Sequence, residues 1–216
     1  MKSGNDSSVA LAFACPPDCG HCCTHLQREP EPGVAAFRAQ LRRHGVYHCA
    51  DAASGGLSLA SAEADALREE AAARGMRLRL HPRTYLLETR RRLAVVLDWH
   101  MPDASCPFYA DYRCTVYERR PLVCRAYPVM LASPLVFAPA CPKAPALAAE
   151  VRAEKRARRA LDDAHARVDA DAWRAMERGR FAKGLPAREA AARMRRYRHV
   201  PLADYLCAVP ERSSTS

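Results

Sequence analysis

The sequence predicts an α+β fold that is predominantly α, with one small β-hairpin, cysteine-rich irregular loops and a C-terminal helical extension. Three observations lead to this class. Apolar residues recur at helical spacing in several segments, one pair of neighbouring segments has a strand-like composition, and prolines interrupt residues 102–143. The 216 residues are enough for a sizeable buried core, so the fold does not depend on disulfides.

Two helices are predicted in the first third of the chain. Within residues 29–45, the apolar positions lie three and four residues apart, and Gly45 ends the helix; these positions are Val34, Phe37 and Leu41. The second helix covers residues 61–75, where Ser61 is the predicted N-cap and acidic residues fill the first turn.

Residues 84–89 (TYLLET) and 93–101 (LAVVLDWHM) form the predicted antiparallel hairpin. Both are rich in aromatic, β-branched and leucine residues, and the arginine run 90–92 separates them. We expect no second strand pair of comparable strength.

Helical spacing returns after Pro145, and charged residues and alanine fill the intervening positions. Two further short helices are expected within residues 171–181 and 185–200, divided at Gly179 and Gly184. The organisation that follows is a cysteine-cluster metal-binding domain at residues 1–143 and a basic helical extension at residues 144–216.

Eight of the ten cysteines fall into two blocks. Four are packed into the nine residues CPPDCGHCC and four lie within the proline-rich stretch: Cys15, Cys19, Cys22 and Cys23, then Cys106, Cys114, Cys124 and Cys141. Four thiols in nine positions, beside Asp18 and Gly20, are not the product of core packing. Cys49 and Cys207 stand apart from both blocks.

The interpretation of these thiols depends on whether the protein lies in a reducing or an oxidising cell compartment. The apolar run VALAFA near the N-terminus has six residues, short of the roughly 7 to 15 of a secretion signal, and no stretch approaches the roughly 20 apolar residues of a membrane span. We therefore expect a soluble cytoplasmic protein without membrane contact. In a reducing cytosol, clustered cysteines are metal ligands or catalytic groups more often than disulfides.

The eight thiols amount to two four-cysteine shells, and both zinc and iron-sulfur clusters are held by such shells. The adjacent Cys22 and Cys23 are hard to place on one ion, so either one is spare or each serves a different centre. Proline follows Cys15, Cys106 and Cys141, as it follows the last ligand of the bacterial ferredoxin run. This favours an iron-sulfur cluster, 4Fe-4S in particular, with zinc as the alternative.

Other side chains near the blocks have predicted supporting roles. Arg119, Arg120 and Arg125 would offset the negative charge of a thiolate shell around Cys124. His21 and His25 could substitute as ligands. The net charge of +10 is concentrated in the C-terminal extension, which favours a protein partner and, more weakly, nucleic acid.

CPPDCGHCC followed by CPFYADYRCTVYERRPLVCRAYPV resembles the YkgJ-type cysteine-cluster family of zinc- or iron-chelating proteins. The matching positions are Cys19, Cys22, Cys23, Cys106, Pro107, Phe108, Cys114, Tyr117, Arg120, Pro121, Cys124, Arg125 and Cys141. Cys15 departs from the pattern, because three residues separate it from Cys19 where the family has two. The resemblance extends over roughly residues 10–143, and residues 144–216 match no family pattern.

Three functions are compatible with these features. The first is a redox or cluster-dependent role at an iron-sulfur centre. The second is a zinc-stabilised binding module in which the metal holds the proline-rich loops together. The third, protein-lysine N-methylation, is implied only by the family's distant likeness to flagellin lysine N-methylase, and no glycine-rich strand-to-helix turn supports a methyl-donor site.

Overall fold

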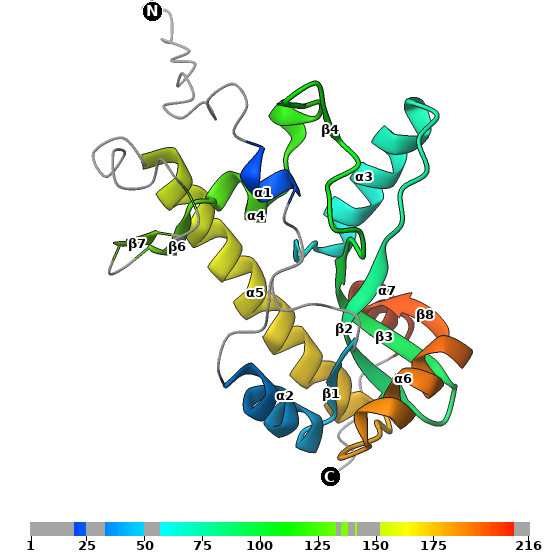
Figure 1. Cartoon of the computed structure of the whole chain (residues 1–216). Helices are drawn as coiled ribbons and strands as arrows, with labels where there is room; N and C mark the ends of the chain where they lie inside the picture. Colours follow the sequence, from blue (N-terminus) through cyan, green and yellow to red (C-terminus); the bar gives the residue numbers. More distant parts are fainter. Residues whose placement is uncertain are drawn as a thin grey trace, which may run out of the picture.

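The computed structural model describes residues 20–24, 33–49, 57–132, 135–137, 141 and 152–209. A four-stranded sheet in the order β1-β2-β3-β8 lies at one end of the molecule, and the short elements of the cysteine blocks lie at the other (Figure 1). The helices are α1 (His21–Thr24), α2 (Val34–Arg43), α3 (Ser61–Ala73), α4 (Leu122–Ala126), α5 (Arg152–Arg178), α6 (Ala187–Arg196) and α7 (Leu202–Ala208), with the 3₁₀ turn η1 (Tyr117–Arg119). The strands are β1 (Val46–His48), β2 (His81–Glu88), β3 (Leu93–His100), β4 (Tyr109–Ala110), β5 (Arg113–Cys114), β6 (Val129–Ala132), β7 (Leu135–Phe137) and β8 (Arg198–Pro201). The predicted α+β class is confirmed.

The predicted hairpin is the centre of the sheet. β2 and β3 pair antiparallel from His81↔His100 to Glu88↔Leu93, with irregular register around Thr84. Glu88 is buried at the end of β2, and its carboxylate accepts the backbone N–H groups of Arg90 and Arg91 at 3.0 and 2.7 Å. A buried carboxylate needs hydrogen-bond donors, and the backbone of the arginine run supplies them. These bonds hold the turn between β2 and β3.

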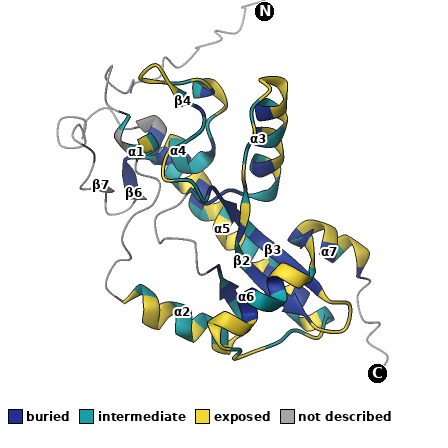
Figure 2. Cartoon of the chain, turned by 45° about the vertical axis from the view of Figure 1, so that its right-hand side comes forward, coloured by how far each residue is buried: buried dark blue, intermediate teal, exposed yellow. Residues whose placement is uncertain are grey.

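Both faces of the sheet are covered, and the buried residues run through its centre (Figure 2). One cluster joins Leu86 and Val95 to α5, α7 and β8, and another joins Tyr85 and Ala94 to Tyr47 and α6. A third cluster packs α3 against Val96 and Trp99, and continues into Phe108 and Val116 of the second cysteine block. The core of the sheet therefore extends directly to the segment that carries Cys106 and Cys114.

The C-terminal segment belongs to the same folded body as the hairpin. β8 pairs parallel with β3, from Leu93↔Arg198 to Val96↔Pro201. Gly179, directly after α5, lets the chain pass close to Tyr205, because a Cβ at this position would lie 2.2 Å from the Tyr205 hydroxyl oxygen. The extension thus supplies a strand of the sheet and the helices over it, while the predicted division at residue 143 stays a prediction.

Several sequence expectations differ from the structure. α5 runs unbroken to Arg178, so no separate helix begins at residue 171, and residues 198–201 are a strand rather than the end of a helix. β1, β8 and the pairs β4–β5 and β6–β7 add strands that the sequence did not predict. These strands are two to four residues long, too short to produce a clear alternation of apolar residues.

Two predicted helix details are also corrected. α2 forms where expected, but none of its residues is buried, and Phe37 on its predicted apolar face is 61% exposed. Ser61 does not cap α3. It is the first helical residue and accepts a hydrogen bond from Trp99 Nε1 at 3.2 Å, while Glu63 accepts the N–H of the N-cap residue Ala60 at 3.1 Å.

Among the described residues, no helix combines the length and the apolar character needed to cross a membrane.

Tyr205 tests how firmly the C-terminal segment is joined to the sheet. It is 1% exposed and packs in the cluster with Leu86 and Val95, so Tyr205→Ala is expected to lower the free energy of unfolding by about 3–5 kcal/mol. Tyr112→Ala is the matched control, because that side chain is 67% exposed and its loss should change stability by about 0.5 kcal/mol or less. Urea titrations of the two variants measure the difference, and equal effects would mean that the segment is only loosely attached.

His48 makes the stability depend on pH. Burial, followed by the positive charge of Arg38, lowers its pKa from 6.5 to about 4, and Asp98 opposes the shift. Because the unfolded chain binds this proton more readily, the free energy of unfolding should fall as pH drops from 6.5 toward 4, by about 2 kcal/mol at pH 5. Urea unfolding at pH 7.5 and 5 should show this difference between the wild type and His48→Gln, and parallel pH profiles would contradict it.

Candidate metal centre

The two cysteine blocks meet in the folded chain. Cys22 and Cys23 lie on α1, and the Cys106 backbone N–H donates to the Cys23 carbonyl at 2.7 Å across 82 intervening residues. The remaining members are Cys114 at the end of β5 and Cys124 on α4. Cys22, Cys106 and Cys114 act electrostatically on one another's neighbours, including Cys23 and Cys124, so five sulfurs from distant parts of the chain share one neighbourhood.

Gly20 explains how α1 starts. Its φ of +41° lies in the left-handed region, and its carbonyl accepts the N–H groups of Cys23 and Thr24, both at 2.9 Å. A Cβ on Gly20 would overlap the end of the Tyr109 side chain, so a larger residue here would require that side chain to shift. The positive φ favours glycine at this turn, and the missing side chain leaves room for Tyr109 of the second block.

A tight hairpin brings Cys106 and Cys114 together. β4 and β5 pair through Tyr109↔Cys114, and the two residues of their turn, Asp111 and Tyr112, have φ of +48° and +60°. Positive φ at both positions is the geometry that matches the twist of a two-residue hairpin. The sequence has Asp-Tyr where Asn-Gly is usual, so it carries no clear signal for this hairpin.

Backbone amides are directed at two of the sulfurs. The Phe108 N–H donates to the Cys106 thiol and the Val116 N–H donates to the Cys114 thiol, each from two residues further along the chain, and each donation lowers the thiol's pKa. Phe108 and Val116 are themselves buried in the α3 core. The core therefore orients the donors, and amide donors to sulfur favour the thiolate form that binds metal.

Burial and crowding dominate the ionisation of the group. The pKa of Cys23 is raised far above its usual value. The largest cause is a hydrogen bond with Cys22, followed by burial and by the neighbouring thiols. Burial raises the pKa of Cys106 to about 11, and burial followed by the other thiols raises that of Cys124. Thiols that suppress one another's ionisation would be relieved by a shared cation.

Of the three predicted arginines, the structure brings one to the thiols. Arg120 lowers the pKa of Cys114 and Cys124 and lies over the ring of Tyr117, 3.6 Å from its centroid. Arg119 instead forms an ion pair with Glu70 at 2.6 Å, and Arg125 is exposed. The expectation that all three arginines surround Cys124 is wrong for Arg119, because its guanidinium pairs with the Glu70 carboxylate on α3 instead.

The structure describes some of the remaining predicted ligands and isolated cysteines but not others. Cys15 and Cys19 lie outside the described residues, as do His25 and the side chain of His21. Cys141 is 7% exposed and is the one residue described between 137 and 152, so its role stays a prediction. Cys49 is buried beside Tyr85 and α6, and Cys207 is exposed on α7, in agreement with their separation from the two blocks.

The donor set fits a thiophilic metal, because thiolate sulfur is the preferred ligand of zinc and of iron-sulfur clusters. Within the described part of the chain, however, no three histidine, cysteine, aspartate or glutamate side chains are already arranged to hold one ion. The five thiols are neighbours, and a metal would have to draw them together.

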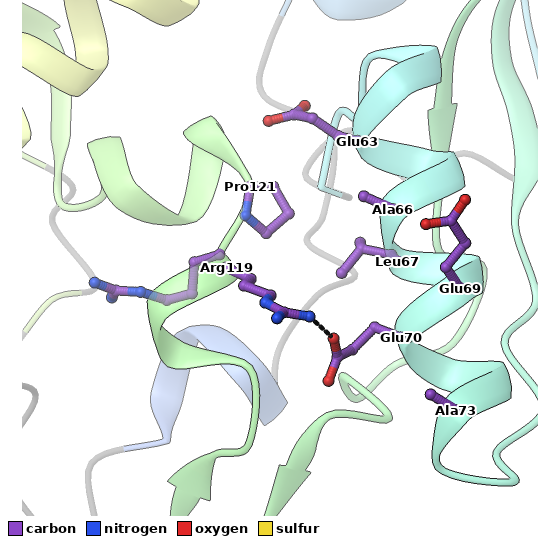
Figure 3. A pocket seen from close by; sticks show the side chains of 9 residues that line it. Glu63, Ala66, Leu67, Glu69, Glu70, Ala73, Arg119 and Pro121 are labelled. Atoms are coloured by element: carbon purple, nitrogen blue, oxygen red, sulfur yellow. Dashed lines mark hydrogen bonds and ion pairs between the residues drawn. The ribbon is translucent and has the colours of Figure 1, made fainter.

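α3 forms the wall behind the second block, a role that the sequence did not indicate. A pocket of about 340 Å³ lies between α3 and residues 119–121, and Glu63, Glu70 and Arg119 are among its lining residues (Figure 3). Glu63 and Glu70 lie seven positions apart, on one face of the helix. That spacing was visible in the sequence, but nothing identified the distant segment that this face would meet.

Comparison with known proteins agrees with this geometry. No curated protein and no solved structure gave a significant match to the chain. The model of one family, described as "CxxCxxCC: Putative zinc- or iron-chelating domain", matches residues 14–142, which include both cysteine blocks. The match takes in more than half of the chain, and the protein therefore belongs to the CxxCxxCC family.

Proposed function

We propose that the two cysteine blocks hold an iron-sulfur cluster of the 4Fe-4S type and that the protein has a redox or cluster-dependent role. The observation that carries this proposal is the gathering of five thiols from blocks that are 82 residues apart. The proposed ligands are drawn from the eight predicted cysteines: Cys15, Cys19, Cys22, Cys23, Cys106, Cys114, Cys124 and Cys141. The description of the family supports metal chelation in general, and the choice of an iron-sulfur cluster is our inference.

The gathered thiols outnumber the four cysteines of one centre, whether that centre is a structural zinc ion or a 4Fe-4S cluster. A structural zinc ion takes four ligands in a tetrahedron, and five thiols are already neighbours within the described residues. Among them are Cys22 and Cys23, which are adjacent in the chain and whose thiols are hydrogen-bonded to each other. The choice of an iron-sulfur cluster rests instead on the Cys-Pro steps at Cys15, Cys106 and Cys141, which are of the kind that closes the bacterial ferredoxin ligand run.

The surrounding residues suit a centre whose charge changes. An iron-sulfur cluster, when bound, supplies one-electron exchange at a potential set by hydrogen bonds to sulfur, net charge and solvent exposure. Here Phe108 and Val116 donate backbone N–H groups to sulfur, and Arg120 adds a positive charge beside Cys114 and Cys124. Cys106 and Cys114 are half-buried, which would leave the centre near the surface, where a partner protein could exchange electrons.

Anaerobic purification tests the identity of the metal. The proposal predicts a brown protein with sulfur-to-iron charge-transfer absorption near ~400 nm and about four irons per cluster. Elemental analysis of the same sample gives the stoichiometry. A colourless protein that carries stoichiometric zinc under these conditions would refute the iron-sulfur assignment and favour the zinc-stabilised binding module.

Single cysteine substitutions test the ligand set. Cys106→Ser and Cys124→Ser should each reduce bound iron and the visible absorption severely, because each replaces a sulfur of the gathered group by a harder donor. Cys207→Ser is the matched control, since Cys207 is exposed on α7, and it should leave both unchanged. Equal iron content in all three variants would show that the cluster is held elsewhere.

The cytoplasmic location and the protein partner remain proposals that rest on the sequence. Protein-lysine methylation rests on family likeness alone, and labelled methyl-donor incubation with the cluster-loaded protein would test it.

A further inference from the structure

α3 contacts the second cysteine block at three points, each close to a predicted ligand. Arg74 Nη2 donates to the Thr115 carbonyl at 3.1 Å, directly after Cys114. Glu70, which also pairs with Arg74, binds Arg119 at 2.6 Å. Glu63 Oε1 accepts the Leu122 backbone N–H at 2.7 Å, two residues before Cys124.

Glu63 has an unusual position among these contacts, because one carboxylate serves two helices. Its Oε2 accepts the N–H of Ala60, the N-cap of α3, at 3.1 Å, and its Oε1 accepts the first N–H of α4. α4 has no side-chain cap of its own, since its N-cap is Pro121. A carboxylate at this end also complements the partial positive charge of the helix N-terminus.

The bridge links parts of the site that have different supports. Cys106 and Cys114 rest on the α3 core through Phe108 and Val116. Cys124, in contrast, lies on the five-residue α4, which packs mainly against α5. Glu63 therefore connects the helix that carries Cys124 to the helix that supports the other two thiols.

We propose that Glu63 is a positioning residue of the metal centre, which holds α4 so that Cys124 faces Cys106 and Cys114. This proposal rests on the metal-binding function proposed above. Glu63 does not contact the metal and acts through the Leu122 amide. Loss of such a supporting contact typically weakens metal binding by about 10- to 100-fold.

Glu63→Gln tests the role, because it keeps the size of the side chain but replaces one acceptor oxygen by a donor. Glu69→Gln is the matched control: it removes the same charge from the same helix, and Glu69 is exposed and turned away from Arg119 (Figure 3). The first readout is amide hydrogen exchange of residues 119–126 in the metal-free protein. The second is the rate at which the loaded protein loses iron or zinc to excess chelator.

We expect Glu63→Gln to speed exchange at Leu122–Ala126 and to release metal about tenfold faster, while Glu69→Gln matches the wild type in both measurements. If Glu63→Gln does not fold, Glu63→Asp serves instead, because it keeps the charge but is too short to reach both amides.

Identical behaviour of the Glu63 and Glu69 variants would overturn the proposal, as would faster exchange without faster metal release. Failure of the proposed function is distinguishable, since it would appear as a wild-type protein that binds no metal. The exchange measurement does not depend on loading and still reports whether Glu63 holds α4.

Discussion

The contact between the two cysteine blocks is the constraint on which the rest of the site depends. It is made by the hydrogen bond from the Cys106 N–H to the Cys23 carbonyl and by the fit of Gly20 against Tyr109. Closing a loop of 82 residues costs conformational entropy, but that cost rises only slowly with length, by about 0.6 kcal/mol per doubling. The entropy cost is offset here because the β2–β3 hairpin and α3 fold the intervening chain into a buried core that ends at the second block.

That core explains why the site is organised before metal arrives and yet incomplete. Phe108 and Val116 belong to the α3 cluster, so the amides that donate to Cys106 and Cys114 are held by packing. The thiols raise one another's pKa, which is the electrostatic cost of gathering groups that carry like charge when ionised. Arg120 offsets part of this cost, and a cation would offset the rest. The scaffold thus brings together sulfurs whose thiolate forms a bound metal would stabilise.

The C-terminal segment contributes to the site indirectly. β8 completes the sheet beside β3, while α5 reaches from that sheet to α4, against which it packs. Cys124 is therefore placed between two long helices, with α5 on one side and the Glu63 contact from α3 on the other. The basic C-terminal segment therefore also supports the cysteine blocks, through the packing of α5 against α4.

Features that depend on residues close together in the sequence could be predicted from the sequence. The hairpin and the positions of α2, α3 and α6 depend on neighbouring residues, and these predictions are confirmed, while the set of cysteine ligands stays a prediction. The capping by Glu63, the pairing of Arg119 with Glu70, the Asp-Tyr turn and the two- to four-residue strands depend on partners far along the chain, and the sequence pattern missed them. By itself, the sequence determined which residues carry the sulfur and that α2, α3 and α6 are helical, because both follow from residue type and local period. Only the tertiary structure decided which sulfurs meet and what holds them, because those contacts are selected by the packing of segments that no local pattern connects.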